Sequence, residues 1–291
     1  MIITKIEGGL GNQMFQYAFG RTLATRNNSE LKLDITPFET FKLFPYSLDN
    51  FNIDKNYATE DELRPFLKCR PRQGRLGRFI LNPFFYDSNR YIIEKDFCFQ
   101  PEMLNLKDPC YVDGYWQSEK YFLDIENEIR KEFTLRNPLG QYSKLISKKI
   151  SSVENPVSLH IRRNDRVKDE RTKILHGSSS EEYYKEAMNI INEKTKNPTY
   201  FVFSDDIEWA RANVKTGFPT EFIGQGHDKN YEDMELMRLC KHHILANSTF
   251  GWWGAWLSDH YKTGITIAPK RWNIKFDTKD LLPKHWIVLS L

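Results

Sequence analysis

The 291-residue chain is 40% hydrophobic and 14% aromatic, which can fill the cores of about two domains and excludes intrinsic disorder. Its 42 Lys and Arg residues nearly balance 39 Asp and Glu residues, and the formal charge of +3 argues against a dedicated nucleic-acid-binding protein. The longest apolar run, at 250–257, is far shorter than the roughly 20 residues that span a bilayer.

The first residues, 1–9, lack the basic start and the apolar stretch of a signal peptide. The cysteines form no Cys-x-x-Cys pair and are too sparse for a disulfide framework. We therefore expect a cytoplasmic protein without a membrane span. A basic stretch at 68–78 is expected on a solvated surface; the alternative is a patch that faces an anionic substrate or the inner face of a membrane, to which the protein would bind peripherally.

The N-terminal part of the chain predicts a strand at 2–6, a glycine turn and a helix at 12–26 with apolar residues at helical spacing. Residues 35–110 are rich in Pro, Phe and Tyr and predict irregular structure. A strand is predicted at 111–116, followed by a helix at 118–133.

Breaks at 137–140 and 155–156 flank a predicted amphipathic helix at 141–152. From residue 157 on, apolar strands alternate with amphipathic helices. The strands are predicted at 157–161, 200–204, 221–223, 243–246 and 266–268, and the helices at 180–194, 207–212, 231–239 and 248–257. This alternation predicts parallel βαβ units in a doubly wound sheet, whose ligands bind at the carboxyl ends of the strands.

The glycine-rich turn Gly-Gly-Leu-Gly-Asn-Gln at 8–13 joins the first strand to the first helix, where backbone N–H groups and the helix dipole favour an anion. It lacks the Gly-Lys-Ser/Thr of a P-loop and the third glycine of a dinucleotide-binding fingerprint. Either the glycines only permit a tight turn, or they let the backbone approach a sugar or a phosphate. The candidate contact residues are Gly9, Gly11, Asn12 and Gln13.

The run His-Ile-Arg-Arg-Asn-Asp at 160–165 leaves the end of a predicted strand. Because side chains alternate along a strand, His160 and Arg162 are expected to point one way and Arg163 another. One guanidinium could then bind a diphosphate through two parallel hydrogen bonds, while the other braces the loop or pairs with Asp165.

Three polar residues, Ser204, Asp205 and Asp206, also follow a strand. Acidic side chains at that position hold ribose hydroxyls or brace a loop; the alternative is that Ser204 or Asp205 caps the next helix. The chain contains no Asp-x-Asp, His-Glu-x-x-His or zinc-type spacing, so no obligatory metal is expected. The pair at 242–243, two histidines, is interpreted as a helix-to-strand junction rather than a ligand pair.

The segment 247–257 begins after another predicted strand. Ser248 and Thr249 are placed to cap the following helix and to offer hydroxyl and N–H groups to an anion. Its three tryptophans are interpreted as core residues, with a sugar-stacking platform as the alternative.

Together these segments resemble the family-11 glycosyltransferases, the α-1,2-fucosyltransferases. The resemblance is carried by the motifs at 8–18 (GGLGNQMFQYA), 160–165 (HIRRND), 203–206 (FSDD) and 247–256 (NSTFGWWGAW). It implies an α/β fold of the GT-B type, two Rossmann-like domains facing across a cleft.

The resemblance further implies an acceptor-side domain at 1–140 and a nucleotide-sugar-binding domain at 155–291. It implies an inverting galactoside α-1,2-fucosyltransferase, which moves L-fucose from GDP-β-L-fucose to the 2-OH of a terminal galactose in a glycan. The setting expected for such an enzyme is O-antigen or surface-polysaccharide synthesis in a bacterium. Animal relatives carry an N-terminal transmembrane stem, which is not expected here.

Carried onto this sequence, the resemblance makes Arg162 the group that holds the β-phosphate and stabilises the leaving diphosphate in place of a metal. Asp165 is the first candidate for the base that an inverting displacement requires, and Glu170 the second. The remaining donor-binding candidates are His160, Arg163, Ser204, Asp205, Asp233, Asn247, Ser248 and Thr249.

Two other functions compete with this interpretation. A transferase that uses another nucleotide sugar or another acceptor would keep the same site. A non-catalytic carbohydrate-binding protein would explain the aromatic residues but has no need for the arginine site, so GDP binding discriminates between the two.

Overall fold

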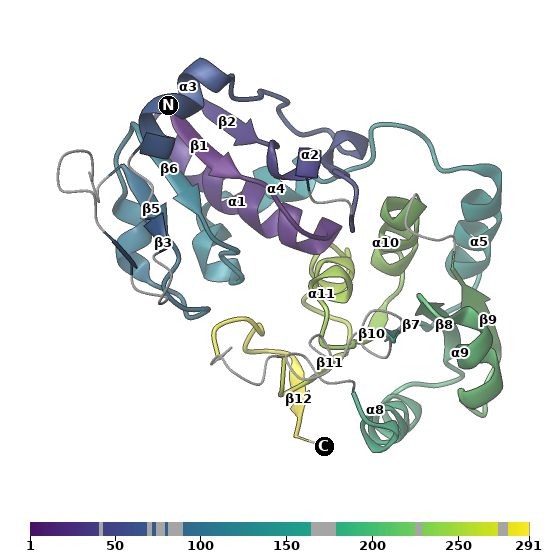
Figure 1. The fold of residues 1–291 in the computed structure, drawn as a ribbon. Coiled ribbons are helices and arrows are strands. Elements are labelled where there is room, and N and C mark those ends of the chain that lie inside the picture. Colours follow the sequence, from purple (N-terminus) through teal and green to yellow (C-terminus); the bar gives the residue numbers. More distant parts are fainter. Residues whose placement is uncertain are drawn as a thin grey trace. The chain divides into compact units, whose positions relative to one another are not determined.

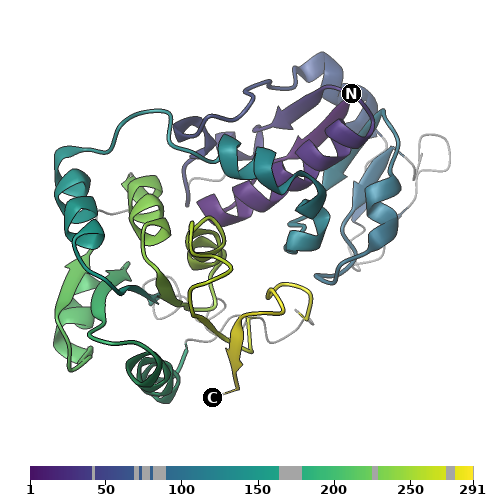
Figure 2. The ribbon, with the colours of Figure 1, turned by 180° about the vertical axis from the view of Figure 1, so that it is seen from behind.

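The computed structural model describes residues 1–40, 43–68, 90–163, 179–224, 229–272 and 279–290, and the backbone of 72–73 and 79–80. The chain divides into two compact units, Met1–Thr134 (unit 1) and Leu135–Leu291 (unit 2). Each unit contains a parallel sheet with helices packed against it (Figures 1 and 2). The predicted α/β class is confirmed.

Unit 1 is built on a four-stranded sheet in the order β2-β1-β6-β5, with every neighbouring pair parallel. Its strands are β1 (Ile2–Lys5), β2 (Leu31–Asp34), β5 (Tyr91–Ile93) and β6 (Cys110–Asp113). The remaining described elements are α1 (Leu10–Arg26), α2 (Pro37–Thr40), η1 (Leu48–Asn50), α3 (Glu60–Lys68), the antiparallel pair β3 (Arg72–Gln73) and β4 (Phe79–Ile80), and η2 (Pro101–Asn105). The expectation that 35–110 is irregular is therefore wrong.

The two faces of the unit 1 sheet are covered by different helices. Thr4 of β1 donates a hydrogen bond to the carbonyl of Gln16 in α1 (3.2 Å), whereas its neighbour Ile3 packs with Leu63 and Phe66 of α3. Since side chains alternate along a strand, α1 and α3 must lie on opposite faces. This sandwich buries β1 completely up to Lys5.

Two predictions in the second half of unit 1 need correction. The strand predicted at 111–116 ends at Asp113, and Trp116 has a φ of 54°, which a strand cannot contain. The single helix predicted at 118–133 is instead two 3₁₀ turns and a short helix, because adjacent Tyr121 and Phe122 are both buried against α1, on Phe19 and Phe15. These elements are η3 (Glu119–Tyr121), η4 (Leu123–Ile125) and α4 (Glu126–Glu132).

Unit 2 is built on a six-stranded parallel sheet in the order β12-β11-β10-β7-β8-β9. Its strands are β7 (Pro156–Ile161), β8 (Thr199–Ser204), β9 (Thr220–Ile223), β10 (His242–Ile244), β11 (Thr266–Pro269) and β12 (Ile287–Leu289). Its helices are α5 (Gln141–Ser151), α8 (Glu181–Lys194), α9 (Ile207–Asn213), α10 (Asn230–Arg238) and α11 (Thr249–Trp256). This is the strand order of a Rossmann fold, as predicted.

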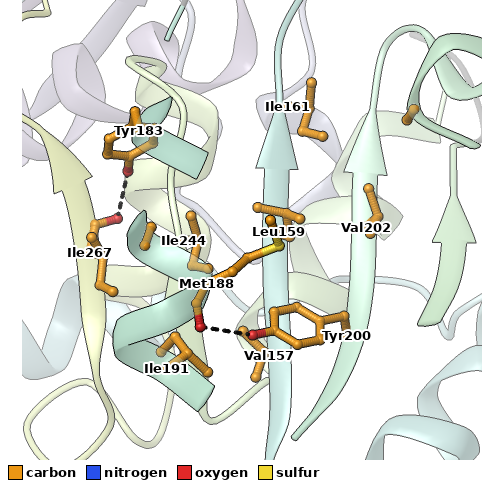
Figure 3. Packing of buried hydrophobic residues seen from close by; sticks show 12 residues of the cluster. Val157, Leu159, Ile161, Tyr183, Met188, Ile191, Tyr200, Val202, Ile244 and Ile267 are labelled. Carbon is orange, nitrogen blue, oxygen red and sulfur yellow. Dashed lines mark hydrogen bonds between the residues drawn. The ribbon is translucent and has the colours of Figure 1, made fainter. Parts of the chain in front are cut away.

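Helices pack on both faces of the unit 2 sheet. On one face, α8 lies over β7, β8, β10 and β11, and the hydroxyl of Tyr183 donates to the carbonyl of Ile267 (3.2 Å; Figure 3). On the other face, Ile146 of α5 and Leu236 of α10 pack against Phe203 of β8. The helix predicted at 141–152 thus belongs to unit 2.

The tryptophans of α11 form part of the unit 2 core. Trp252, Trp253 and Trp256 are fully buried, and the indole N–H of Trp252 donates to the carbonyl of Leu281 (2.8 Å). The interpretation of these three residues as core residues is confirmed. His242 and His243 are the first residues of β10, so the predicted helix-to-strand junction is also confirmed.

Among the described helices, none combines the length and apolar character that crossing a bilayer would require. Of the basic stretch at 68–78, Lys68 ends α3 and is exposed. The other basic side chains of that stretch lie outside the described residues.

Candidate active site

The strand order of unit 2 reverses between β7 and β10. From β7 the chain proceeds outward through β8 and β9 on one side, and β10, β11 and β12 extend on the other. In open parallel sheets, ligands bind at the carboxyl ends of the strands beside such a reversal. Three of the predicted segments begin there: 160–163 at the end of β7, 204–206 at the end of β8 and 247–249 after β10.

The ends of β7 and β8 are joined through Asp205. Its carboxylate accepts a hydrogen bond from the backbone N–H of Arg163 (2.8 Å) and forms an ion pair with Arg162, at 3.9 Å from Nε to Oδ2. The side chains of Arg162 and Asp205 are only 18% and 16% exposed, so solvent screens this charge pair less than a surface pair.

Arg163 has a different environment from Arg162. Its guanidinium lies over the ring of Trp209 in α9, 3.8 Å from the ring centroid, and its Nε is 3.7 Å from the carboxylate of Asp206. Both contacts fix Arg163, two residues beyond the end of β7, to the start of α9. The structure therefore separates the two adjacent arginines: Arg163 is held by α9, and Arg162 lies beside Asp205.

The start of α9 corrects one detail of the sequence analysis. The residue that caps the helix is Asp206, whose carboxylate accepts from the N–H of Trp209 (3.2 Å), not Ser204 or Asp205. The Ser204 hydroxyl accepts from the N–H of Asp206 (3.0 Å). Both interactions order the turn between β8 and α9. Asp205 takes no part in the cap and instead contacts Arg162 and Arg163 at the end of β7.

The start of α11 meets the end of β7. His160 is buried, with 5% exposure, and its ring lies 5.6 Å from that of Phe250, between centroids. Ser248 occupies the N-cap position of α11, as predicted, but its hydroxyl makes no capping hydrogen bond. The first N–H groups of this helix therefore lie beside His160 and donate no hydrogen bond to the Ser248 hydroxyl.

Other predicted donor-site residues take up different positions. Asn247 is buried and Thr249 begins α11. Asp233 lies in the first turn of α10. The pKa of Tyr142 in α5 is raised, first by the burial of Tyr142 and second by the negative charge of Asp233. Asp165 and Glu170 lie outside the described residues.

The glycine-rich turn in unit 1 is held by two buried glutamines. Gly8 has a φ of 79°, which favours glycine. The amide of Gln13 donates to the carbonyls of Gly8 (2.8 Å) and Pro45 (2.9 Å) and accepts from the N–H of Ser47 (2.9 Å). Gln16 accepts from the N–H of Glu7 (2.9 Å). Gln13 thus ties together two loops at the carboxyl edge of the sheet and is itself buried.

The other candidates of that turn differ in exposure: Gly9 and Asn12 are partly exposed, and Gly11 is buried. Gly9 is the N-cap of α1, Gly11 is buried within its first turn, and the side chain of Asn12 accepts from Gln117 (3.0 Å). Within the described part of the chain, no group of three or more His, Cys, Asp or Glu residues is arranged to hold a metal ion.

Two residues of the site were not identified from the sequence. Trp209 could have been predicted from its position three residues after Asp206, the N-cap of α9. A side chain at that position lies on the same side of the helix as the cap and therefore near the preceding strand ends. The second residue is Gly251, whose backbone packs against the ring of His160. The sequence gives no signal for this contact, because a glycine inside a helical pattern does not indicate which residue packs against it.

Known proteins resemble the chain over its whole length. It matches Glycosyl transferase family 11 over residues 1–290. An α-1,2-colitosyltransferase of Escherichia coli is 34% identical, over 99% of this chain and 98% of the relative. The O-antigen biosynthesis glycosyltransferase WbnK of E. coli is 29% identical, over 98% and 99%. A galactoside α-(1,2)-fucosyltransferase 1 of Leontocebus fuscicollis is 31% identical, over 65% and 55%.

Solved structures share the fold at low identity. POFUT1 in complex with GDP aligns with a TM-score of 0.50 and 15% identity, over 92% of this chain and 98% of that one. A mutant of FUT1 from Arabidopsis thaliana aligns with a TM-score of 0.51 and 11% identity, over 88% and 68%. The GT-B type of fold, with two Rossmann-like units, is thereby confirmed. The motifs, the strand order and the match over residues 1–290 lead to one conclusion: the chain belongs to glycosyltransferase family 11.

Proposed function

We propose that the chain transfers L-fucose from GDP-β-L-fucose to the 2-OH of a terminal galactose and forms an α-1,2 linkage. Three comparisons support this proposal: the galactoside fucosyltransferase among the relatives, the O-antigen enzyme that matches the full length, and the GDP-bound solved structure. The O-antigen relative favours a role in surface-polysaccharide synthesis.

The observation that carries the proposal is the position of Arg162 at the strand reversal. A GDP-sugar presents a diphosphate. Arg162 at the end of β7 and the first turn of α11 after β10 lie at adjacent strand ends, and we assign both to binding this anion. Ser248 and Thr249 would donate to the same phosphates. Arg163, held by Trp209 and Asp206, would position the neighbouring Arg162 rather than bind the phosphates itself.

The nucleoside would be bound by the polar groups around the two phosphate-binding elements. We assign His160, Ser204, Asp205, Asn247 and Asp233 to the guanine and the ribose. Carboxylates accept from ribose hydroxyls, and amide and imidazole groups can match the donors and acceptors of a base edge.

The reaction would proceed as a single displacement with inversion. The acceptor oxygen attacks the anomeric carbon of fucose as the bond to the diphosphate breaks, and a carboxylate, Asp165 or Glu170, accepts the proton of the acceptor hydroxyl. Negative charge develops on the departing diphosphate, and Arg162 would stabilise it without a metal ion. The glycine-rich turn with Gly9, Gly11, Asn12 and Gln13 would shape the acceptor side.

The test is the variant Arg162→Ala, with Arg136→Ala, at an exposed arginine of unit 2, as the matched control. Loss of a charge-stabilising donor lowers kcat by about 10² to 10³. We expect this loss, with retained folding, in Arg162→Ala only, and partial recovery in Arg162→Lys, which keeps the charge without the fork geometry. Near-normal turnover of Arg162→Ala contradicts the phosphate assignment.

A second candidate is the transfer of colitose, because a colitosyltransferase is 34% identical over nearly the full length. Colitose is fucose without its 3-hydroxyl. A site that binds this hydroxyl with a polar group discriminates strongly against the deoxy sugar, whereas a site that does not bind it tolerates both. The ratio of kcat/KM for GDP-fucose and GDP-colitose therefore decides between the two donors.

A further inference from the structure

A cavity of about 450 Å³ opens in unit 1 at the carboxyl edge of its own parallel sheet. It lies on the face covered by α3, and its lining includes Lys5, Glu7, Asp34, Leu67 and Tyr115. Here β2 lies on one side of β1 and β6 on the other, so the unit 1 sheet also has a strand reversal beside its first strand. Cavities at such a position are ligand sites in open parallel sheets.

The charged groups at the cavity form a fixed network. The ammonium of Lys5 pairs with the carboxylates of Glu7 (2.8 Å) and Asp113 (3.1 Å). Burial acts to lower the pKa of Lys5, but the charges of Asp113 and Glu7 raise it, so Lys5 stays cationic. The Tyr111 hydroxyl donates to Asp34 (2.6 Å). One ammonium against three carboxylates leaves the network with a negative charge.

Two groups at the mouth of the cavity keep hydrogen-bonding capacity. Among the described residues, the side chain of Glu7 pairs only with Lys5, through one oxygen, and it is 30% exposed. The hydroxyl of Tyr115 has no hydrogen-bond partner within the same set of residues, although burial, and then the charge of Glu7, raise its pKa. The Tyr115 ring is fixed by stacking on Phe97, at 6.0 Å between centroids and an angle of 14°.

This combination suits a hydroxyl-rich, uncharged ligand. Sugar hydroxyls donate to carboxylates and accept from a phenol, and the C–H face of a sugar ring packs on an aromatic ring. A carboxylate on the ligand would instead meet the charges of Glu7 and Asp34 in the lining, while the one lining cation, Lys5, is already paired with Glu7 and Asp113. Like charges at an interface oppose binding. The charges of the lining therefore favour a neutral ligand over an acidic one.

We propose that this unit 1 cavity binds a neutral sugar residue of the acceptor glycan and rejects acidic sugars such as uronic acids. That this sugar belongs to the acceptor rests on the proposed function, whereas the binding of a neutral sugar in the cavity does not depend on it. Glu7 and Tyr115 are the residues that bind hydroxyls, and Leu67 forms the apolar rim.

The test uses the full chain and two probes, methyl β-D-galactopyranoside and the corresponding methyl galactopyranosiduronate, which differ only at C6. Affinities are measured by ligand-observed NMR, without donor, and GDP affinity is measured in parallel. We expect the neutral probe to bind at least about tenfold more tightly than the acid, as for a like charge at about 6 Å in a partly solvated site.

Two variants locate the binding. Leu67→Trp fills the rim, and Leu123→Trp is its control, because Leu67 is 42% exposed and Leu123, in the same unit but outside the cavity, is 43% exposed. We expect at least about a tenfold loss of neutral-probe affinity in Leu67→Trp only, with GDP affinity unchanged. Glu7→Gln should reduce the discrimination between the probes severalfold, whereas Glu102→Gln, at an exposed glutamate of η2, should not.

Equal affinity for both probes, or an unchanged affinity in Leu67→Trp, overturns the inference. These outcomes are separable from failure of the proposed function. If the neutral probe binds in the cavity but the protein transfers no fucose from GDP-fucose, only the assignment of the donor is contradicted. If GDP-fucose is used but Leu67→Trp still binds the neutral probe normally, only the cavity assignment falls.

Discussion

The backbone of Gly251 lies directly against the imidazole of His160. A Cβ at position 251 would be 2.6 Å from His160 Nδ1, closer than real Cβ atoms approach other heavy atoms. This contact joins the first turn of α11 to the end of β7, the two elements at the strand reversal of unit 2. Only glycine allows them to meet at this separation.

The variant Gly251→Ala should therefore impair the proposed donor site. Alanine favours a helix by about 1 kcal/mol over glycine, so any loss must come from displacement of His160. We expect donor KM to rise about tenfold, a change of about 1.4 kcal/mol. The control is Gly254→Ala in the same helix, whose Cβ would meet Met237 at 2.9 Å: it should lower stability but not donor affinity. Equal donor KM values for the two variants would sink the assignment.

The stacking of Arg163 on Trp209 predicts a positioning effect. Removing the ring in Trp209→Leu deletes a cation–π contact of about 0.5–1 kcal/mol at a partly exposed site. Donor KM should rise two- to fivefold while kcat changes little, because Arg163, and with it the neighbouring Arg162, becomes less fixed. The matched control is Phe222→Leu, which removes the ring below Arg211 (5.0 Å). A fall in kcat with unchanged KM would instead mean that Arg163 acts in the chemical step.

Gln13 predicts a stability effect in unit 1. The variant Gln13→Leu leaves two carbonyls and one N–H without their buried partner, and each such group costs about 1–3 kcal/mol. We expect the urea-unfolding midpoint of unit 1 to fall sharply. Gln117→Leu, which removes one half-buried hydrogen bond to Asn12, should cause a much smaller shift. Comparable midpoints for the two variants would contradict the role given to Gln13.

His242 predicts how stability depends on pH. Burial lowers its pKa to about 4 from 6.5, and its Nδ1 accepts a hydrogen bond from the N–H of Ile265 (3.0 Å). As pH falls below 6.5, the unfolded chain binds a proton that the folded chain does not, so stability is lost between pH 6.5 and about 4.

The variant His242→Asn keeps an acceptor but cannot titrate. Near pH 8, the free energy of unfolding of the variant should change with pH as steeply as that of the wild type. Between pH 6.5 and 5, its slope should be smaller by up to about 1.4 kcal/mol per pH unit, the value for one proton. An identical slope in both proteins throughout this range would show that His242 is protonated in the folded state.

The sequence predicts unit 2 well because its four central strands, β7, β8, β10 and β11, are almost entirely buried. Such strands are continuous apolar runs, and helices with one apolar face separate them, so the Rossmann order follows from local pattern. The positions of Arg162 and Ser248 follow with it, since Arg162 comes directly after β7 and Ser248 lies in the short segment between β10 and α11. Local sequence pattern does not indicate which helix residue contacts which strand end. The contact between Gly251 of α11 and His160 of β7 is an example.

Unit 1 is less predictable because its sheet depends on distant pairing. The β5 strand is three residues long and pairs with β6, and β2 pairs with β1 across the whole of α1. Strands this short have no clear alternation of their own. The cavity near Lys5 could not be predicted for the same reason: it needs the ends of β1 and β2 and the end of α3 together.

The central claim is metal-free fucose transfer at the unit 2 site. The most direct test measures product formation from GDP-fucose with galactose-terminated acceptors, in EDTA and again with added Mg²⁺, and determines the linkage by NMR. Our account predicts an α-1,2-linked fucosyl galactoside at the same rate in both conditions. Transfer that stops in EDTA would contradict the role of Arg162 in place of a metal, and the absence of both transfer and GDP binding would contradict the donor site itself.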